Sequence, residues 1–112
     1  MKSPLSDEPM LVLELSGIEI DFCSFTNSIW LDAGELEALL DNPKAADDLI
    51  ASFTPDNKSR ELKVRCPICR KKMEKVVGPN QIIIDRCKHG HGLWFDDGEL
   101  QAILERSERA HV

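Results

Sequence analysis

Apolar and polar residues follow the same order twice along the chain, in two stretches that lie 64 residues apart. Each stretch opens with two short runs rich in branched apolar residues, at 11–15 and 18–22 in the first stretch and at 73–77 and 81–86 in the second. The residues Ser16-Gly17 and Gly78-Pro79-Asn80 separate the runs and favour tight turns. The pattern therefore predicts a β-hairpin in each stretch.

A helix is predicted after each hairpin. Asp32 and Asp96 are the expected N-caps, because Glu35 and Glu99 stand three residues later and complete a capping box. The large aliphatic residues that follow fall on one helical face, which can pack on the hairpin. These residues are Leu36, Leu39 and Leu40 in the first stretch and Leu100, Ile103 and Leu104 in the second.

A further helix is predicted between the two stretches. Asn42 is its expected N-cap and Pro43 its first residue, and the helix should end near Thr54-Pro55. Its apolar face would consist of Leu49, Ile50 and Phe53. From there to Ser59 the chain is polar, which predicts a short linker.

The two stretches also match residue by residue. Positions 18–23 align with 82–87 and positions 30–40 with 94–104, and the aligned segments share Trp, Asp, Gly and Glu at fixed spacing. Chance similarity between two amphipathic segments does not account for these shared residues, so we interpret the match as an internal duplication.

Length and composition limit the classes of function. With 112 residues, 42% apolar and 30% charged, the chain is typical of one soluble globular domain or two very small ones, and leaves little room for a deep catalytic cleft. Its longest apolar runs fall far short of the roughly 18 residues of a membrane helix. The first residues carry acids and prolines where a signal peptide has an apolar stretch. We therefore expect a cytoplasmic protein without membrane partners.

Charge divides the chain into two opposite halves. Residues 1–57 carry a net charge of −10, whereas residues 58–112 carry +4. Much of the positive charge lies in a basic cluster between Arg65 and Lys75. This cluster is either a solvated surface or a surface that faces an anion.

The cysteines are the candidate functional residues. Without a secretion signal, disulfides are improbable, so the pair Cys66-Pro-Ile-Cys69 belongs either to a redox motif or to a metal site. No amphipathic helix follows Cys69, as a thioredoxin-like motif requires; a hairpin follows instead, and then Cys87 with His89 and His91. This spacing predicts two turns across a hairpin that hold one Zn²⁺ in a tetrahedral site.

The fourth ligand has two candidates, because Gly90 stands where a second cysteine would complete the second turn. We expect His91, since an imidazole reaches farther than a thiolate and Gly92 frees the backbone to turn. His89 is the alternative, because a spacing of two residues from Cys87 points it along the same side of an extended segment.

These motifs resemble the transcription factor IIB-type zinc-ribbon family (zf-TFIIB). The family has a Cys-Pro-x-Cys turn, a hairpin, a second Cys-x-x-Cys-Gly-Gly turn, and then Trp, an apolar residue, Asp and Glu-Leu. The matching positions, apart from the missing fourth cysteine, are Cys66-Pro67-Ile68-Cys69, Cys87, Gly92, Trp94-Phe95-Asp96 and Gly98-Glu99-Leu100. The resemblance covers about half of the chain.

The first half resembles the same family in a degenerate form. Cys23 is kept, but Phe25 and Asn27 replace the two histidines, and Ser3 and Ser6 align with Cys66 and Cys69. We therefore expect one zinc ion per chain, held by Cys66, Cys69, Cys87 and His91. The lone Cys23 is expected to act as a small buried apolar residue.

The expected fold is a small, metal-stabilised α+β protein with two zinc-ribbon-like units of a β-hairpin plus a helix. Residues 1–57 form the degenerate unit with the connector helix, and residues 58–112 form the metal-binding unit. Trp30, Trp94 and the helical leucines are expected to share one core between the units.

A closed site with four protein ligands is structural, so we expect no enzyme activity. The acidic residues Asp96, Asp97 and Glu99 serve capping and solvation rather than acid-base catalysis. The preferred function is a protein-interaction module. The alternative is a small nucleic-acid-binding or transcription-associated ribbon that uses the basic cluster.

Overall fold

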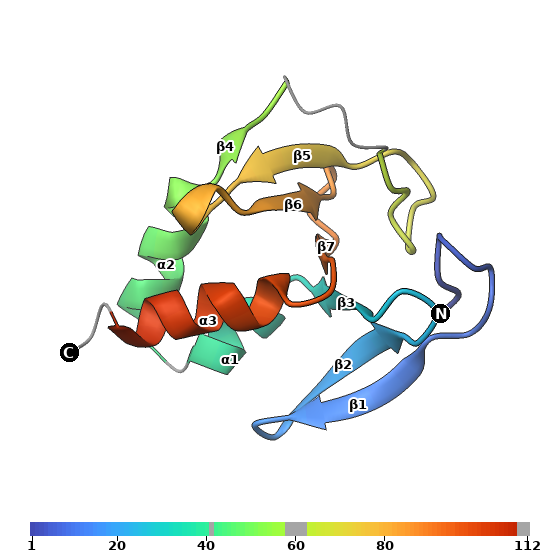
Figure 1. The fold of residues 1–112 in the computed structure, drawn as a ribbon, viewed down its shortest axis with the longest axis horizontal. Helices are drawn as coiled ribbons and strands as arrows, with labels where there is room; N and C mark the ends of the chain where they lie inside the picture. Colours follow the sequence, from blue (N-terminus) through green and yellow to red (C-terminus); the bar gives the residue numbers. More distant parts are fainter. Residues whose placement is uncertain (41, 58–62, 110–112) are drawn as a thin grey trace.

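The computed structural model describes residues 1–40, 42–57 and 63–109. Within these residues the strands form one seven-stranded antiparallel sheet in the order β1-β2-β3-β7-β6-β5-β4 (Figure 1). The strands are β1 (Leu11–Leu15), β2 (Ile18–Cys23), β3 (Ser28–Asp32), β4 (Thr54–Pro55), β5 (Glu74–Val77), β6 (Ile83–Arg86) and β7 (Gly92–Phe95). The helices are α1 (Glu35–Leu40), α2 (Pro43–Ser52) and α3 (Glu99–Arg109), and a 3-10 turn spans Pro79–Gln81. No helix in the described part of the chain is long and apolar enough to cross a bilayer.

Both predicted hairpins are present. In the first, Ser16 and Gly17 have positive φ angles of 51° and 82°, as a two-residue type I′ turn requires. In the second, Asn80 and Gln81 also have positive φ angles, 59° and 61°. The second turn is therefore wider, and β6 begins at Ile83 rather than at the predicted residue 81.

Each hairpin has a third strand that the pattern did not predict. β3 and β7 pair with each other at the centre of the sheet, where Trp30 lies opposite Trp94. Expecting a hairpin followed directly by a helix was therefore wrong. The apolar runs that form β3 and β7 are short and end at the helix-capping residues. In the sequence they therefore resemble a loop that precedes a helix rather than a strand.

Side chains from the two faces of this sheet form two separate cores. Successive residues on a strand face opposite sides, so Trp30 and Leu31 on β3, like Trp94 and Phe95 on β7, belong to different cores. The helix-side core consists of Ile20, Leu31, Leu36, Leu49, Phe53, Val76, Ile84, Phe95, Leu100 and Ile103. The cysteine-side core consists of Met10, Cys23, Trp30, Cys66, Met73, Cys87 and Trp94. The predicted single core of tryptophans and helical leucines was therefore wrong.

The glutamates at the starts of α1 and α3 act as predicted. Glu35 Oε1 accepts a hydrogen bond from the Asp32 N–H at 2.6 Å, and Glu99 Oε1 accepts one from the Asp96 N–H at 2.8 Å. The Asp32 carboxylate has a further partner, because its Oδ1 accepts a hydrogen bond from the Trp30 indole N–H at 2.8 Å. The capping segment thus also fixes the central tryptophan of β3.

The connector helix is confirmed. Asn42 Oδ1 accepts a hydrogen bond from the Ala45 N–H at 3.0 Å, and Pro43 is the first residue of α2. Leu49 and Phe53 are buried in the helix-side core, and Ile50 packs against it.

The segment after this helix differs from the predicted linker. Thr54–Pro55 forms β4, which pairs with β5 and covers the outer edge of that strand. The Asp56 N–H continues the contact by donating to the Lys75 carbonyl at 2.8 Å. Ser59, the predicted end of the linker, lies outside the described residues, as does Lys58 at the predicted boundary between the units.

Candidate metal centre

Two turns at one end of the hairpin bring four potential ligands together. Cys66 and Cys69 come from the turn before β5, Cys87 directly follows β6, and His91 directly precedes β7. One ligand atom from each of these residues lies within 4.8 Å of the others. This cluster can hold a metal ion.

The spacing of the donor atoms fits a tetrahedral zinc ion. Zn–S bonds of about 2.3 Å and Zn–N bonds of about 2.0 Å separate two sulfurs by about 3.8 Å, and a sulfur from a nitrogen by about 3.5 Å. The Cys69 and Cys87 Sγ atoms lie 3.8 Å apart. His91 Nδ1 lies 3.4 Å from Cys87 Sγ and 3.8 Å from Cys66 Sγ. A Cys₃His donor set is typical of structural zinc.

The two turns differ by one residue, which explains the position of the histidine. In the first turn the residue with positive φ is Arg70, four positions after Cys66, with φ 66°. In the second turn it is Gly90, three positions after Cys87, with φ 79°. The second turn closes one residue earlier, and the next residue, His91, then faces the cysteines. A Cβ at Gly90 would have no heavy atom within 4 Å, so this position points away from the cluster.

His89 lies outside this cluster. Its ring is exposed, and its backbone N–H donates a hydrogen bond to Cys87 Sγ at 3.4 Å. The rings of His89 and His91 are 6.4 Å apart between centroids. Among the described residues, the donor cluster contains His91 and not His89.

The protein environment shifts the pKa values of Cys66 and Cys69 in opposite directions. The backbone N–H of Lys71 lowers the pKa of Cys69 to about 7, whereas burial raises the pKa of Cys66 to about 11. The Ile68 N–H partly offsets that burial by donating to Cys66 Sγ at 3.4 Å. Because a metal binds the thiolate, an ion at this site would displace the proton of Cys66.

Strand β3 from the first half supports the second turn. The Ala33 N–H donates to the His91 carbonyl at 2.9 Å, and the Cys87 N–H donates to the Gly92 carbonyl at 3.1 Å. A Cβ on Gly92 would lie 2.1 Å from the Leu31 carbonyl oxygen. The predicted reason for Gly92, freedom to turn, was therefore wrong: Gly92 lies on a strand, and its missing side chain lets β3 approach.

In the first half of the chain, a serine hydroxyl contacts a buried cysteine. Ser3 Oγ donates a hydrogen bond to the buried Cys23 Sγ at 3.0 Å. Burial opposes ionisation of Cys23, but hydrogen bonds from Ser3, Thr26 and Phe25 outweigh it and lower its pKa. Cys23 is 2% exposed, in agreement with its predicted burial, but its polar partners were not predicted.

The backbone hydrogen bonds around Ser3 match those of the first cysteine turn at a constant offset of 63 residues. The Ser3 N–H donates to the Glu8 carbonyl as the Cys66 N–H donates to the Lys71 carbonyl. The Asp7 N–H donates to the Ser3 carbonyl as the Arg70 N–H donates to the Cys66 carbonyl. The Met10 N–H donates to the Met1 carbonyl as the Met73 N–H donates to the Val64 carbonyl. Asp7 and Arg70 both have positive φ angles, 60° and 66°. The two turns therefore have the same backbone form.

The basic cluster is divided by the fold. Arg65, Arg70, Lys71 and Lys72 are exposed around the first cysteine turn. Lys75 is buried on β5 and pairs with the buried Asp85 on β6 at 2.7 Å. The sequence pattern did not predict this ion pair. Lys75 and Asp85 each stand next to a buried apolar residue, Val76 or Ile84, and this alternation is what an exposed charge on a strand would also show.

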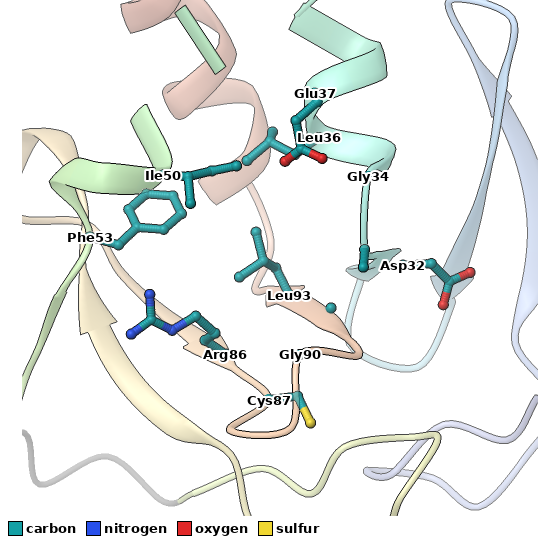
Figure 2. A pocket seen from close by; sticks show the side chains of 12 residues that line it. Asp32, Gly34, Leu36, Glu37, Ile50, Phe53, Arg86, Cys87, Gly90 and Leu93 are labelled. Carbon is teal, nitrogen blue, oxygen red and sulfur yellow. The ribbon is translucent and has the colours of Figure 1, made fainter. Parts of the chain in front are cut away.

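A pocket of about 220 Å³ lies on the other side of the second turn (Figure 2). Leu36, Ile50, Phe53 and Leu93 give it an apolar lining. In Figure 2 the Cys87 sulfur points away from these side chains. The pocket therefore does not open onto the Cys87 sulfur.

Comparison with known proteins supports the resemblance for part of the chain. The family model of the TFIIB-type zinc ribbon, described as a transcription factor zinc-finger, matches residues 65–106. This segment includes all four residues of the donor cluster. No curated protein and no solved structure gave a match. The matched segment thus supports a zinc-ribbon domain with a possible metal site.

Proposed function

We propose that this chain is a non-catalytic protein-interaction module of the cytoplasm, stabilised by one structural zinc ion. Cys66, Cys69, Cys87 and His91 would hold the ion. The four donor atoms within 4.8 Å of one another are the observation that carries this proposal.

A structural role for the zinc follows from the closure of the site. Four protein ligands complete the tetrahedron, so no coordination position remains for a water or a substrate. Cys66 and Cys87 are buried and the remaining two donors are half-buried. The ion would fix the two turns relative to each other and leave the surface of the domain to engage a partner.

We further propose that the two halves are tandem copies and that the first copy has lost its metal. The turn hydrogen bonds that recur at an offset of 63 residues support this proposal. In the first copy a hydrogen bond joins Ser3 to Cys23, whereas in the second copy the aligned residues Cys66 and Cys87 would share a metal ion. Hydroxyl groups bind Zn²⁺ weakly compared with thiolates, so we expect one zinc per chain.

The histidine ligand provides the direct test. Elemental analysis of the zinc-loaded wild-type chain should give one ion. His91→Ala should weaken zinc binding by about two orders of magnitude, because a metal–ligand bond is lost, whereas its matched control His89→Ala should change it by less than about threefold. A competition titration with a chromophoric chelator measures both variants. Two tightly bound ions, or the opposite ranking of the histidines, would contradict the proposal.

Nucleic-acid binding is the second candidate. Four exposed basic side chains around the first cysteine turn favour it: Arg65, Arg70, Lys71 and Lys72. Trp94 and Phe95 are both fully buried, which leaves neither ring free to stack on a base. Binding through this basic cluster would therefore rest on phosphate contacts and should weaken steeply with salt. A titration with duplex DNA and single-stranded RNA at two salt concentrations separates this function from a protein-interaction role.

A further inference from the structure

Within the described part of the chain, the outer edge of β1 is an unpaired edge of the sheet. β1 is the terminal strand on one side, and its sequence Leu11-Val-Leu-Glu-Leu15 contains no lysine or proline, the residues that commonly block an edge. In Figure 1 β1 lies on the outer side of β2, facing away from the rest of the sheet. Leu11, Val12 and Leu13 are 51%, 62% and 42% exposed.

The opposite end of the sheet shows how the corresponding edge is covered. β5 occupies the same place beside β6 as β1 does beside β2, and the chain itself adds β4 to the outer edge of β5. β4 is an extended two-residue segment that ends in Pro55. Within the described residues β1 has only β2 as a paired neighbour.

The hairpin turn determines which groups of β1 point outward. In a two-residue hairpin the pair that flanks the turn, here Leu15 and Ile18, is hydrogen-bonded, and the bonded pairs then alternate along the strands. Leu13 and Leu11 are therefore bonded to β2. The peptide N–H and C=O groups of Val12 and Glu14 point away from β2, where a further strand can pair with them.

The side chains specify the chemistry of that further strand. Leu13 lies opposite Ile20, which belongs to the helix-side core, so the leucines of β1 extend that apolar surface beyond the helices. The other face of the hairpin carries Glu14, Glu19 and Asp21, and residues 11–23 contain no basic residue. A matching strand would alternate apolar residues toward the leucines with basic residues toward the carboxylates.

We propose that β1 binds an extended basic peptide segment of a partner protein, which pairs with the sheet edge as an added strand. This inference rests on the proposed protein-interaction function and names the surface and the partner chemistry. A second copy of this chain fits less well. In an antiparallel β1–β1 pair centred on Leu13, Glu14, Glu19 and Asp21 of both copies would crowd one face of the joined sheet.

The electrostatics of the hairpin agree with a basic partner. Burial and the neighbouring Asp32 raise the pKa of Asp21, the N-terminal ammonium group opposes this rise, and Glu19 adds to it. The carboxylates therefore outweigh the nearby positive charge in their effect on Asp21, and positive side chains of a bound strand would relieve the remaining repulsion.

The test uses the full zinc-loaded chain and a synthetic probe. The probe is a capped seven-residue peptide that alternates valine and lysine, and a valine–glutamate peptide of the same length is its control. The lysine peptide should protect the Val12 and Glu14 amides from hydrogen exchange, measured by NMR, while the glutamate peptide leaves them unprotected. If millimolar lysine peptide gives no protection at these amides, the proposal is wrong.

Two variants at one position separate edge pairing from general damage. Val12→Pro removes an outward N–H without breaking the bonds to β2, and should weaken peptide binding by at least about tenfold. Val12→Thr keeps the N–H and should bind as the wild type. Equal binding by both variants would overturn edge pairing. A wild-type dimer in sedimentation that Val12→Pro converts to a monomer would assign the edge to a second copy and overturn the peptide partner. Zinc content, measured in the same samples, reports separately on the proposed metal function.

Discussion

Replacing Cys87 by serine is expected to abolish tight zinc binding and cooperative folding of the second half. Cys87 Sγ is the donor that links the two turns, at 3.8 Å from Cys69 Sγ and 3.4 Å from His91 Nδ1. Structural zinc contributes an apparent binding free energy of about 10 kcal/mol or more, as large as the net stability of a small domain. Zinc content and thermal unfolding followed by circular dichroism measure the two losses.

Cys23→Ser is the matched control for this substitution, because Cys23 is equally buried but lies in the half without a predicted metal. It exchanges a thiol for a hydroxyl that Ser3 can still reach, so we expect a cost of about 1 kcal/mol and unchanged zinc content. Similar zinc loss in both variants would show that Cys23 is a ligand and that the first half is not metal-free.

Gly92→Ala is expected to separate the central strands and destabilise the whole sheet. The new Cβ would lie 2.1 Å from the Leu31 carbonyl oxygen and 2.7 Å from Trp30 Cζ2, so β3 and β7 could not keep their pairing. Because backbone must move on both strands, we expect a loss of at least about 3 kcal/mol in the free energy of unfolding. Urea denaturation of the zinc-loaded protein measures it.

Gly98→Ala distinguishes this clash from the general cost of replacing a glycine. Gly98 has a φ of 82°, but a Cβ there would meet no heavy atom within 4 Å. Its replacement should cost only about 1 kcal/mol, from the strained backbone conformation. If the two variants were equally stable, close approach of β3 and β7 would not be the reason for Gly92.

The parts of the fold that could be predicted are those encoded in neighbouring residues. The turn residues Ser16-Gly17 and the cap Asn42 act within a few positions of themselves, and the structure contains the elements they predict. The cysteine and histidine spacing likewise identified the residues that the fold brings together, because both turns close locally. His91 could be preferred to His89 because the argument concerned only how far an imidazole side chain reaches within one short turn.

The missed features depend on contacts between distant segments. β3 is a central strand because β7 pairs with it on the side away from β2, 64 residues later at the tryptophans, and no local pattern reports that pairing. Gly92 is required by the Leu31 carbonyl of the other half. The buried pair of Lys75 and Asp85 similarly needs the register of β5 and β6, without which each residue resembles an exposed charge.

The pairing of Trp30 with Trp94 gives the protein a built-in optical probe. They are the only two tryptophans in the sequence, both are fully buried, and both belong to the core that contains Cys66 and Cys87. Intrinsic fluorescence and near-ultraviolet dichroism therefore arise at the line where the two halves of the chain join. A change in emission on removal of a metal would report that the disturbance had reached this junction, without any attached dye.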